Sequence, residues 1–193
     1  TKIRKYTLEL YKELEKKVGH SAGLRLNGAL SIAQNQGRWE ELKRQATTAQ
    51  LYDVDVRILD KNQIKKECPI VNTDEVLGGI LMPGDGAADP SGVTHMLAKA
   101  AKMEGAQIFE KSPVEKILTK NGKIAGVRVN GQEIECEYIV LASGMWSRQI
   151  GEKAGVSIPL YPAEHFYIIT EPIENLSKTM PVVRDFDNRT YIK

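Results

Sequence analysis

The chain has 193 residues, of which 41% are hydrophobic and 27% charged, and its formal net charge is +2. This composition is typical of a globular protein with one sizeable core, or with one domain and part of another. The small net charge predicts no nucleic-acid partner. No apolar run approaches the ~18 residues of a membrane helix and no signal-peptide core is present, which predicts no membrane partner. We therefore expect a cytoplasmic protein, or a mitochondrial matrix protein in a eukaryote.

The first 70 residues predict three helices and one stranded segment. A helix over the first 18 residues ends at Gly19, and the alternation in residues 23–36 predicts a strand or a hairpin. A second amphipathic helix follows, and a short third helix begins at its cap Asp60 and stops before Pro69. The apolar faces of the first two helices are Leu10, Tyr11, Leu14 and Val18, then Trp39, Leu42, Ala46 and Ala49.

The middle of the chain predicts a loop and a further helix. The run "GGILM" leads through a turn-rich stretch to Asp89, a good N-cap, and Pro90, which suits the first helical position. Gly105 ends this helix, and residues 106–110 predict a short strand. The apolar stripe of the helix is Val93, Met96, Leu97, Ala100 and Ala101.

Residues 113–140 predict three strands in a meander. Asn121-Gly122 and Asn130-Gly131 separate the strands, and Asn-Gly favours tight hairpins because both turn residues adopt positive φ. The last strand continues into an unbroken apolar run up to Ala142, which predicts burial on both faces as in a parallel sheet. Small residues then turn the chain into a helix near Trp146.

The last forty residues predict long strands, first over residues 158–172 and then in the run that ends the sequence. His165, Tyr167 and Ile169 share one face of the first strand. Cys68 and Cys136 are far apart and predict packed thiols in place of a disulfide. The three histidines have no metal-ligand spacing, which argues against a zinc site.

Three stretches together, residues 78–117, 138–173 and 181–185, resemble the FAD-dependent D-amino-acid-oxidase superfamily. The Asp-Gly…Asp-Pro loop and the "ASGMWS" turn fit the superfamily as a whole. The stretch "AEHFYIITEP" is similar to the dimethylglycine and sarcosine dehydrogenases within it. The resemblance covers most of the chain after Leu77 and is more diffuse before it.

The resemblance implies a mixed α/β fold in two parts. Residues 71–155 would form an incomplete segment of a Rossmann-like FAD domain of the two-dinucleotide type, with its β-meander. Residues 1–70 and 156–193 would form incomplete segments of a substrate domain with an antiparallel sheet. The implied activity is oxidation of sarcosine or dimethylglycine by hydride transfer to flavin.

The resemblance also assigns residues to the cofactor. Val114 matches the position whose backbone pairs with the adenine edge, and Ala142, Ser143 and Gly144 let the backbone approach the dinucleotide, followed by Trp146 in the same turn. The G-x-G-x-x-G turn for the pyrophosphate and the flavin-linking histidine are absent from the sequence. We therefore expect an internal piece of a larger oxidoreductase, whose partners are the missing N- and C-terminal parts, and which alone holds no FAD and is inactive.

The same resemblance places His165 toward a small amino-acid substrate, with Tyr191 as a second active-site residue. A neutral histidine can accept or relay the proton of the amine. Arg184 has two interpretations, either a bidentate carboxylate ligand or a surface salt bridge with Asp185 or Asp187. His20 and His95 have no such support.

Two other functions stay open at this point. The chain fits a glycerol 3-phosphate or 2-hydroxy-acid dehydrogenase of the same superfamily, or an interaction module without catalysis. The exact substrate, the electron acceptor, the mode of FAD attachment and any folate-binding partner domain are not readable from the sequence.

Overall fold

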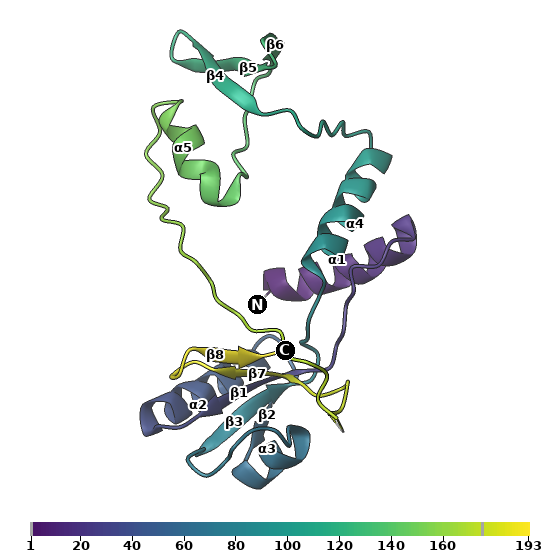
Figure 1. The fold of residues 1–193 in the computed structure, drawn as a ribbon, viewed down its shortest axis with the longest axis vertical. Helices are drawn as coiled ribbons and strands as arrows, with labels where there is room; N and C mark the ends of the chain where they lie inside the picture. The colour runs from purple at the N-terminus through teal and green to yellow at the C-terminus, as the bar shows by residue number, and fades with distance from the viewer. Residues whose placement is uncertain (1, 175) are drawn as a thin grey trace. The chain divides into compact units, whose positions relative to one another are not determined.

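The computed structural model describes residues 2–174 and 176–193, and these form two compact units of a mixed α/β chain (Figure 1). Unit 1 consists of Thr1–Ala106 and Ile173–Lys193, and unit 2 of Gln107–Pro172. Among the described helices, none is long and apolar enough to cross a membrane. These two units are defined by which residues contact one another within the chain. The division into FAD-domain and substrate-domain segments that the sequence suggested stays a prediction.

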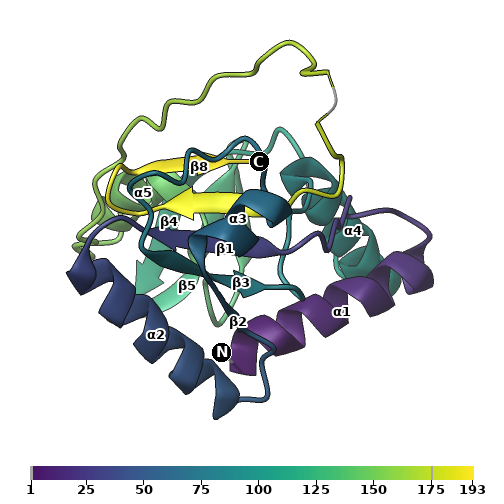
Figure 2. The same cartoon turned by 90° about the horizontal axis from the view of Figure 1, so that it is seen from below.

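A five-stranded mixed sheet organises unit 1. Its strand order is β2-β3-β1-β7-β8, with β1 antiparallel to β3 and parallel to β7 (Figure 2). All five residues of the central strand β1 are buried. The strands are β1 (Ala29–Ala33), β2 (Arg57–Leu59), β3 (Gly78–Met82), β7 (Val182–Asp185) and β8 (Thr190–Ile192).

Alternate residues of the sheet pack against two different helices. Leu30 and Ile32 share a core with Ile64 of α3 (Lys61–Glu67). Ala33 packs instead with Leu42 of α2 (Gln36–Gln50). Because successive side chains of a strand point to opposite faces, α2 and α3 cover opposite faces of the sheet.

Local capping signals begin two helices of unit 1. Asp60 is the predicted N-cap of α3 and forms a capping box, since its side chain accepts from Asn62 and Gln63 while the Gln63 side chain accepts from the backbone N–H of Asp60. Asp89 caps α4 (Pro90–Met103) by accepting from Gly92 N at 2.8 Å. Both predicted caps are confirmed.

Helices α1 (Lys2–Val18) and α4 pack on one another through a separate small core. Val18 and Ala22 meet Met96 and Ala100 there, and Gly19 adopts the positive φ of a C-cap. The predicted spacing of both helices is thereby confirmed, although Leu97 lies on the exposed side of α4.

Unit 2 contains the predicted meander as a three-stranded antiparallel sheet. The strands are β4 (Val114–Lys120), β5 (Lys123–Val129) and β6 (Gln132–Glu135). Asn121 and Asn130 have φ of 53° and 50°, so both Asn-Gly turns have the predicted backbone. A short 3₁₀ helix η1 (Gly144–Trp146) and helix α5 (Ser147–Glu152) follow.

Three predicted strands were wrong. Residues 106–110, the run up to Ala142 and residues 158–172 form no strand. The side chains of Tyr138 and Val140 are exposed, where burial on both faces was predicted. A strand needs a neighbour for its backbone groups, and the described part of the chain pairs none with these three segments.

Candidate functional site

The β7–β8 hairpin is held by the carboxylate of Asp185. Its Oδ1 accepts from the backbone N–H groups of Asp187 and Asn188, both at 3.1 Å. Its Oδ2 accepts from Asn188 Nδ2 at 2.8 Å and from Gln34 Nε2 at 3.0 Å. These four hydrogen bonds use the carboxylate of Asp185 to hold the turn and to join it to Gln34.

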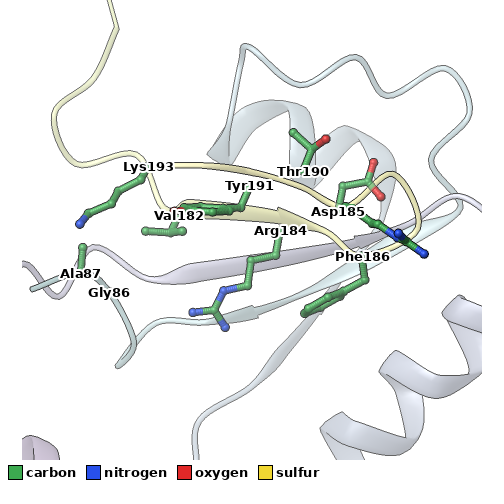
Figure 3. Close-up of a pocket in the computed structure, with 10 residues that line it drawn as sticks. Gly86, Ala87, Val182, Arg184, Asp185, Phe186, Thr190, Tyr191 and Lys193 are labelled. Carbon is green, nitrogen blue, oxygen red and sulfur yellow. The ribbon is translucent and has the colours of Figure 1, made fainter. Parts of the chain in front are cut away.

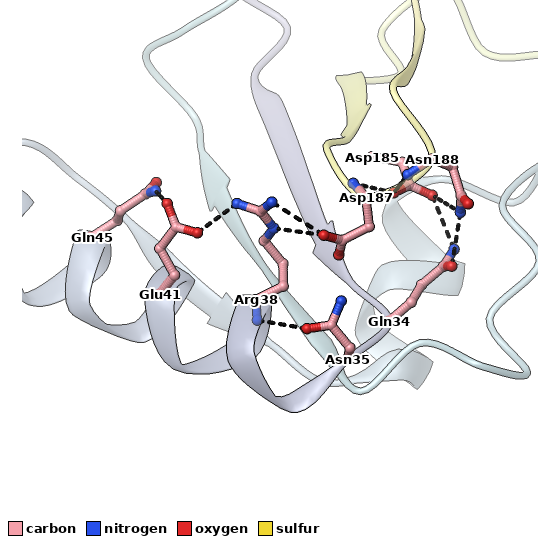
Figure 4. Close-up of polar contacts among 8 residues, drawn as sticks. All are labelled: Gln34, Asn35, Arg38, Glu41, Gln45, Asp185, Asp187 and Asn188. Carbon is pink, nitrogen blue, oxygen red and sulfur yellow. Dashed lines mark hydrogen bonds and ion pairs between the residues drawn. The ribbon is translucent and has the colours of Figure 1, made fainter.

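Arg38 of α2 fixes the same turn from outside (Figure 4). Its Nε and Nη2 donate to Asp187 Oδ1 at 3.2 and 3.1 Å, Nη1 pairs with Glu41, and the guanidinium lies 5.4 Å from the ring centre of Phe186. The hydrogen bond to Asp187 raises the pKa of Arg38 above its ordinary value. Asn35, whose side chain accepts from Arg38 N, starts the helix that carries this clamp.

An open pocket of about 570 Å³ lies against this hairpin within unit 1 (Figure 3). Arg184 of β7 and Tyr191 of β8 are directly opposite each other in the antiparallel ladder. Because residues in this position point to the same face of the sheet, both side chains lie on one face. The other lining residues are Gly86, Ala87, Val182, Asp185, Phe186, Arg189, Thr190 and Lys193.

Arg184 has neither of the acidic partners considered from the sequence. Asp185 and Asp187 are occupied in the turn, and the ion pair of Arg184 is with Asp85, whose Oδ2 lies 3.7 Å from Nη2. The side chains of this pair are 34% and 41% exposed. Sequence reasoning missed Asp85 as a partner, although the Asp85-Gly86 pair was noted as a family feature.

The loop before α4 lines the pocket with Gly86 and Ala87, and it is held by two backbone hydrogen bonds and one side-chain hydrogen bond. Arg25 and Ala87 form an antiparallel bridge, with N–H to carbonyl distances of 2.8 and 2.9 Å. Lys193 Nζ donates to Ala88 O at 3.4 Å. The contact of Lys193 and the ion pair of Arg184 with Asp85 join this loop to the β7–β8 hairpin, an association that the sequence did not predict.

The predicted cofactor residues all lie in unit 2. Val114 begins β4, and Ala142 and Ser143 precede Gly144, which has φ of 55° and has nothing within 4 Å of where a Cβ would stand. The side chain of Trp146 is 60% exposed. Small side chains and open space fit one wall of a dinucleotide site, and residues 138–142, which were predicted to lead into it as a strand, form none.

The two predicted catalytic residues lie in different units. His165 is in the exposed segment of unit 2 that forms no strand, so the predicted sharing of one strand face with Tyr167 and Ile169 is wrong. Tyr191 is in β8 of unit 1, in a strand as predicted. A site that uses both residues stays a prediction.

The remaining candidates considered from the sequence are two histidines and two cysteines. His20 and His95 contact each other edge to face, with ring centres 6.0 Å apart. The described residues include no group of three or more side chains able to hold a metal ion. Cys68 and Cys136 are both free thiols, as predicted, and burial raises the pKa of the Cys68 thiol.

Comparison with known proteins shows where the chain is similar. The family model described as DAO, FAD dependent oxidoreductase, matches residues 1–193. The chain is 35% identical over its whole length to 4-methylaminobutanoate oxidase (formaldehyde-forming) of Paenarthrobacter nicotinovorans, of which it covers 23%. It is 35% identical over 94% of its length to human mitochondrial sarcosine dehydrogenase, of which it covers 20%.

Two further similarities are to a regulatory subunit and to a solved dehydrogenase structure. The chain is 32% identical over its whole length to the mitochondrial pyruvate dehydrogenase phosphatase regulatory subunit of Mus musculus, of which it covers 22%. Among solved structures, L-proline dehydrogenase from P. horikoshii superposes with a TM-score of 0.80 at 25% identity, over 97% of this chain and 50% of that one. The chain thus spans about a fifth of the length of these curated relatives.

Proposed function

The chain belongs to the DAO family of FAD-dependent oxidoreductases, and from this membership we propose that it is part of an enzyme that oxidises an N-methylated amino acid such as sarcosine or dimethylglycine. The observation that carries the proposal is 35% identity to two relatives whose names specify methylamino acids, sarcosine in one and 4-methylaminobutanoate in the other. Both compounds combine a methylated amine with a carboxylate. The substrate site must therefore bind the carboxylate and hold the amine in its neutral form.

The proposed chemistry asks three things of the protein. It must fix the substrate, exclude water and handle the proton of the amine, while bound FAD supplies the hydride acceptor. We assign the proton to His165, because imidazole accepts a proton near neutral pH. We assign the hydroxyl of Tyr191 to the wall of the substrate pocket, which the lining of the unit 1 pocket by Tyr191 supports.

The proposed cofactor wall is in unit 2. The backbone of Val114 would pair with the adenine edge, and the small residues Ala142, Ser143 and Gly144 would allow close approach of the dinucleotide beside Trp146. The open space around Gly144 supports this assignment. The pyrophosphate turn would have to come from sequence outside this chain, because no G-x-G-x-x-G occurs within it.

The proposal is tested with the protein that the complete gene encodes. Anaerobic mixing with sarcosine or dimethylglycine should bleach the flavin, and glycerol 3-phosphate and lactate should not. Bleaching by glycerol 3-phosphate or by lactate, with none by either methylated amino acid, would contradict the proposal and assign the protein to a hydroxy-compound dehydrogenase of the same family.

A second candidate is an interaction module without catalysis. It is favoured by the 32% identity, over the whole chain, to a relative that is named as a regulatory subunit and not as an oxidase. A complete gene product that binds no flavin, or binds it and is bleached by none of the four compounds, would favour this second function.

A further inference from the structure

The two Asn-Gly turns of the meander carry a reactive group that the proposed function does not use. We propose that Asn121-Gly122 is a site of spontaneous deamidation, at which the exposed asparagine becomes aspartate or isoaspartate, and that Asn130-Gly131, a turn of the same kind in the same sheet, is protected from this reaction. The inference concerns the chemistry of the chain itself in water and goes beyond the proposed function.

The reaction needs only water and the groups of the turn itself. The backbone nitrogen of the glycine loses its proton and forms a bond with Cγ of the asparagine, the bond between Cγ and Nδ2 breaks, and Nδ2 leaves as ammonia with that proton. Water then adds to either carbonyl of the resulting cyclic imide and opens it to aspartate or isoaspartate. Asparagine is a thermolabile residue, and a following glycine has no side chain to hinder the attack.

The two turns are matched in geometry. Asn121 and Asn130 have φ of 53° and 50°, and Gly122 and Gly131 have φ of 73° and 76°. All four residues are exposed, and a Cβ built on either glycine would meet no described atom within 4 Å. Backbone conformation and access therefore do not distinguish the two turns, and any difference in their reactivity must come from the charges and hydrogen bonds around them.

Two positive charges flank the first turn. Lys120 and Lys123 stand on either side of it and are directly opposite each other in the ladder of β4 and β5, a position in which like charges repel. The negative charge that develops on the attacking nitrogen of Gly122 is attracted by both cations. The carboxylate of the product also reduces the repulsion between them, so both effects favour deamidation at Asn121.

A carboxylate protects the second turn. Glu115 Oε1 accepts a hydrogen bond from Gly131 N at 3.2 Å, so this nitrogen must lose its acceptor and develop negative charge beside a carboxylate before it can attack. Among the described residues, Gly122 N has no such side-chain acceptor. Arg128, which attracts Glu115, is itself paired with Glu133 at 2.6 Å, so it does not cancel the charge of Glu115.

The difference decides which end of the meander changes with time. Aspartate at position 121 suits the same turn, because Asp-Gly also favours it, whereas isoaspartate lengthens the main chain by a carbon atom and disrupts the pairing of Lys120 with Lys123. Val114, the predicted adenine residue, pairs with Val129 beside the protected turn. Deamidation at Asn121 therefore alters the opposite end of β4 and leaves the end at Val114 unchanged.

The test follows both asparagines in one peptide. The folded chain is incubated in mildly alkaline buffer, and cleavage after glutamate releases residues 116–133, which contain both turns. Tandem mass spectrometry then measures at each asparagine the replacement of the amide by a carboxyl group. We expect Asn121 to react about three- to tenfold faster than Asn130, the factor that corresponds to one hydrogen bond, and both to react at similar rates in guanidinium chloride. Equal rates in the folded chain, including no reaction at either position, would overturn the inference.

Two variants identify the cause of the difference. Glu115→Gln removes the carboxylate and should accelerate deamidation of Asn130 about two- to fivefold. Lys120→Gln combined with Lys123→Gln should slow deamidation of Asn121 about two- to fivefold. In each variant the asparagine of the other turn is the control and should react at its wild-type rate, and circular dichroism checks that the fold is retained. A ratio of the two rates that neither variant changes would refute the role of the charges.

Discussion

Asp185 and Asp187 lie two positions apart in one turn, yet their carboxylates have different partners. Asp185 bonds inward to the turn and to Gln34, while Asp187 bonds to Arg38 of α2. Composition could not distinguish these two aspartates, and the sequence analysis considered either of them as a possible salt-bridge partner of Arg184. Their actual partners lie about 150 residues away, at separations of 151 and 149, which no local pattern reports.

Asp185→Ala should destabilise unit 1 by about 0.5–1.5 kcal/mol, because the turn loses the acceptor of four hydrogen bonds, of which the one from Gln34 is partly buried. Urea unfolding at neutral pH measures the change. Asp55→Ala, which removes one side of the exposed contact with Arg57, should change stability by less than about 0.5 kcal/mol. Equal effects of the two substitutions would show that the hydrogen bonds of Asp185 contribute nothing specific to the fold.

His165→Ala in the complete protein should slow flavin reduction by dimethylglycine about 10²–10⁴-fold, the usual cost of losing a positioned proton acceptor. Tyr191→Phe should slow it less, because only a hydroxyl is removed. Stopped-flow bleaching at saturating substrate gives both rates, with the flavin content of each variant as the control. A wild-type rate in His165→Ala would show that His165 takes no part in the reaction.

At the scale of elements, the helices and the strands of the meander were predicted well, and β1 also lies within a predicted segment although its partners β3 and β7 are distant in sequence. A helix satisfies its own backbone groups, so the cap Asp60 and the spacing in α4 were sufficient to place them. The meander is equally local, since two Asn-Gly turns join its strands. The segment at residues 158–172 has the alternation of a strand, but alternation reports side chains and says nothing of a hydrogen-bonding neighbour.

The packing of α2 on the sheet also depends on a residue that no periodicity highlights. A Cβ at Gly78 would lie 2.6 Å from the ring of Trp39, so glycine in β3 makes the room that this tryptophan fills. Gly78→Ala should therefore destabilise the chain by about 1–3 kcal/mol through overpacking.

Thermal or urea unfolding measures the effect of Gly78→Ala, and Gly84→Ala is the matched control, because a Cβ at Gly84 would meet nothing within 4 Å. The control should lie within about 0.5 kcal/mol of the wild type. If Gly78→Ala were as stable as Gly84→Ala, the contact with Trp39 would be loose enough to absorb a methyl group.

At the scale of the whole molecule, the sheet of unit 1 joins the two ends of the sequence. β1 from the first third pairs with β7 from the last tenth, and this pairing creates the face on which Arg184 and Tyr191 lie. The sequence identified the two residues separately through chemistry and resemblance. It could not place them opposite each other, because that follows from the register of a hairpin whose turn has no Asn-Gly signal.

Whether the 193-residue chain binds FAD without the rest of the protein also depends on the whole molecule. Residues 138–142 form no strand, and the two short helices that follow Ser143 have three and six residues, too few for a strong helix dipole at a phosphate. The G-x-G-x-x-G turn is also absent from the sequence. We therefore expect the 193-residue chain to purify without flavin, even after incubation with excess FAD, while the complete gene product retains it. Absorbance and fluorescence of the protein peak after gel filtration measure this, and stoichiometric flavin eluting with the chain alone would show that the residues around Gly144 form a sufficient site.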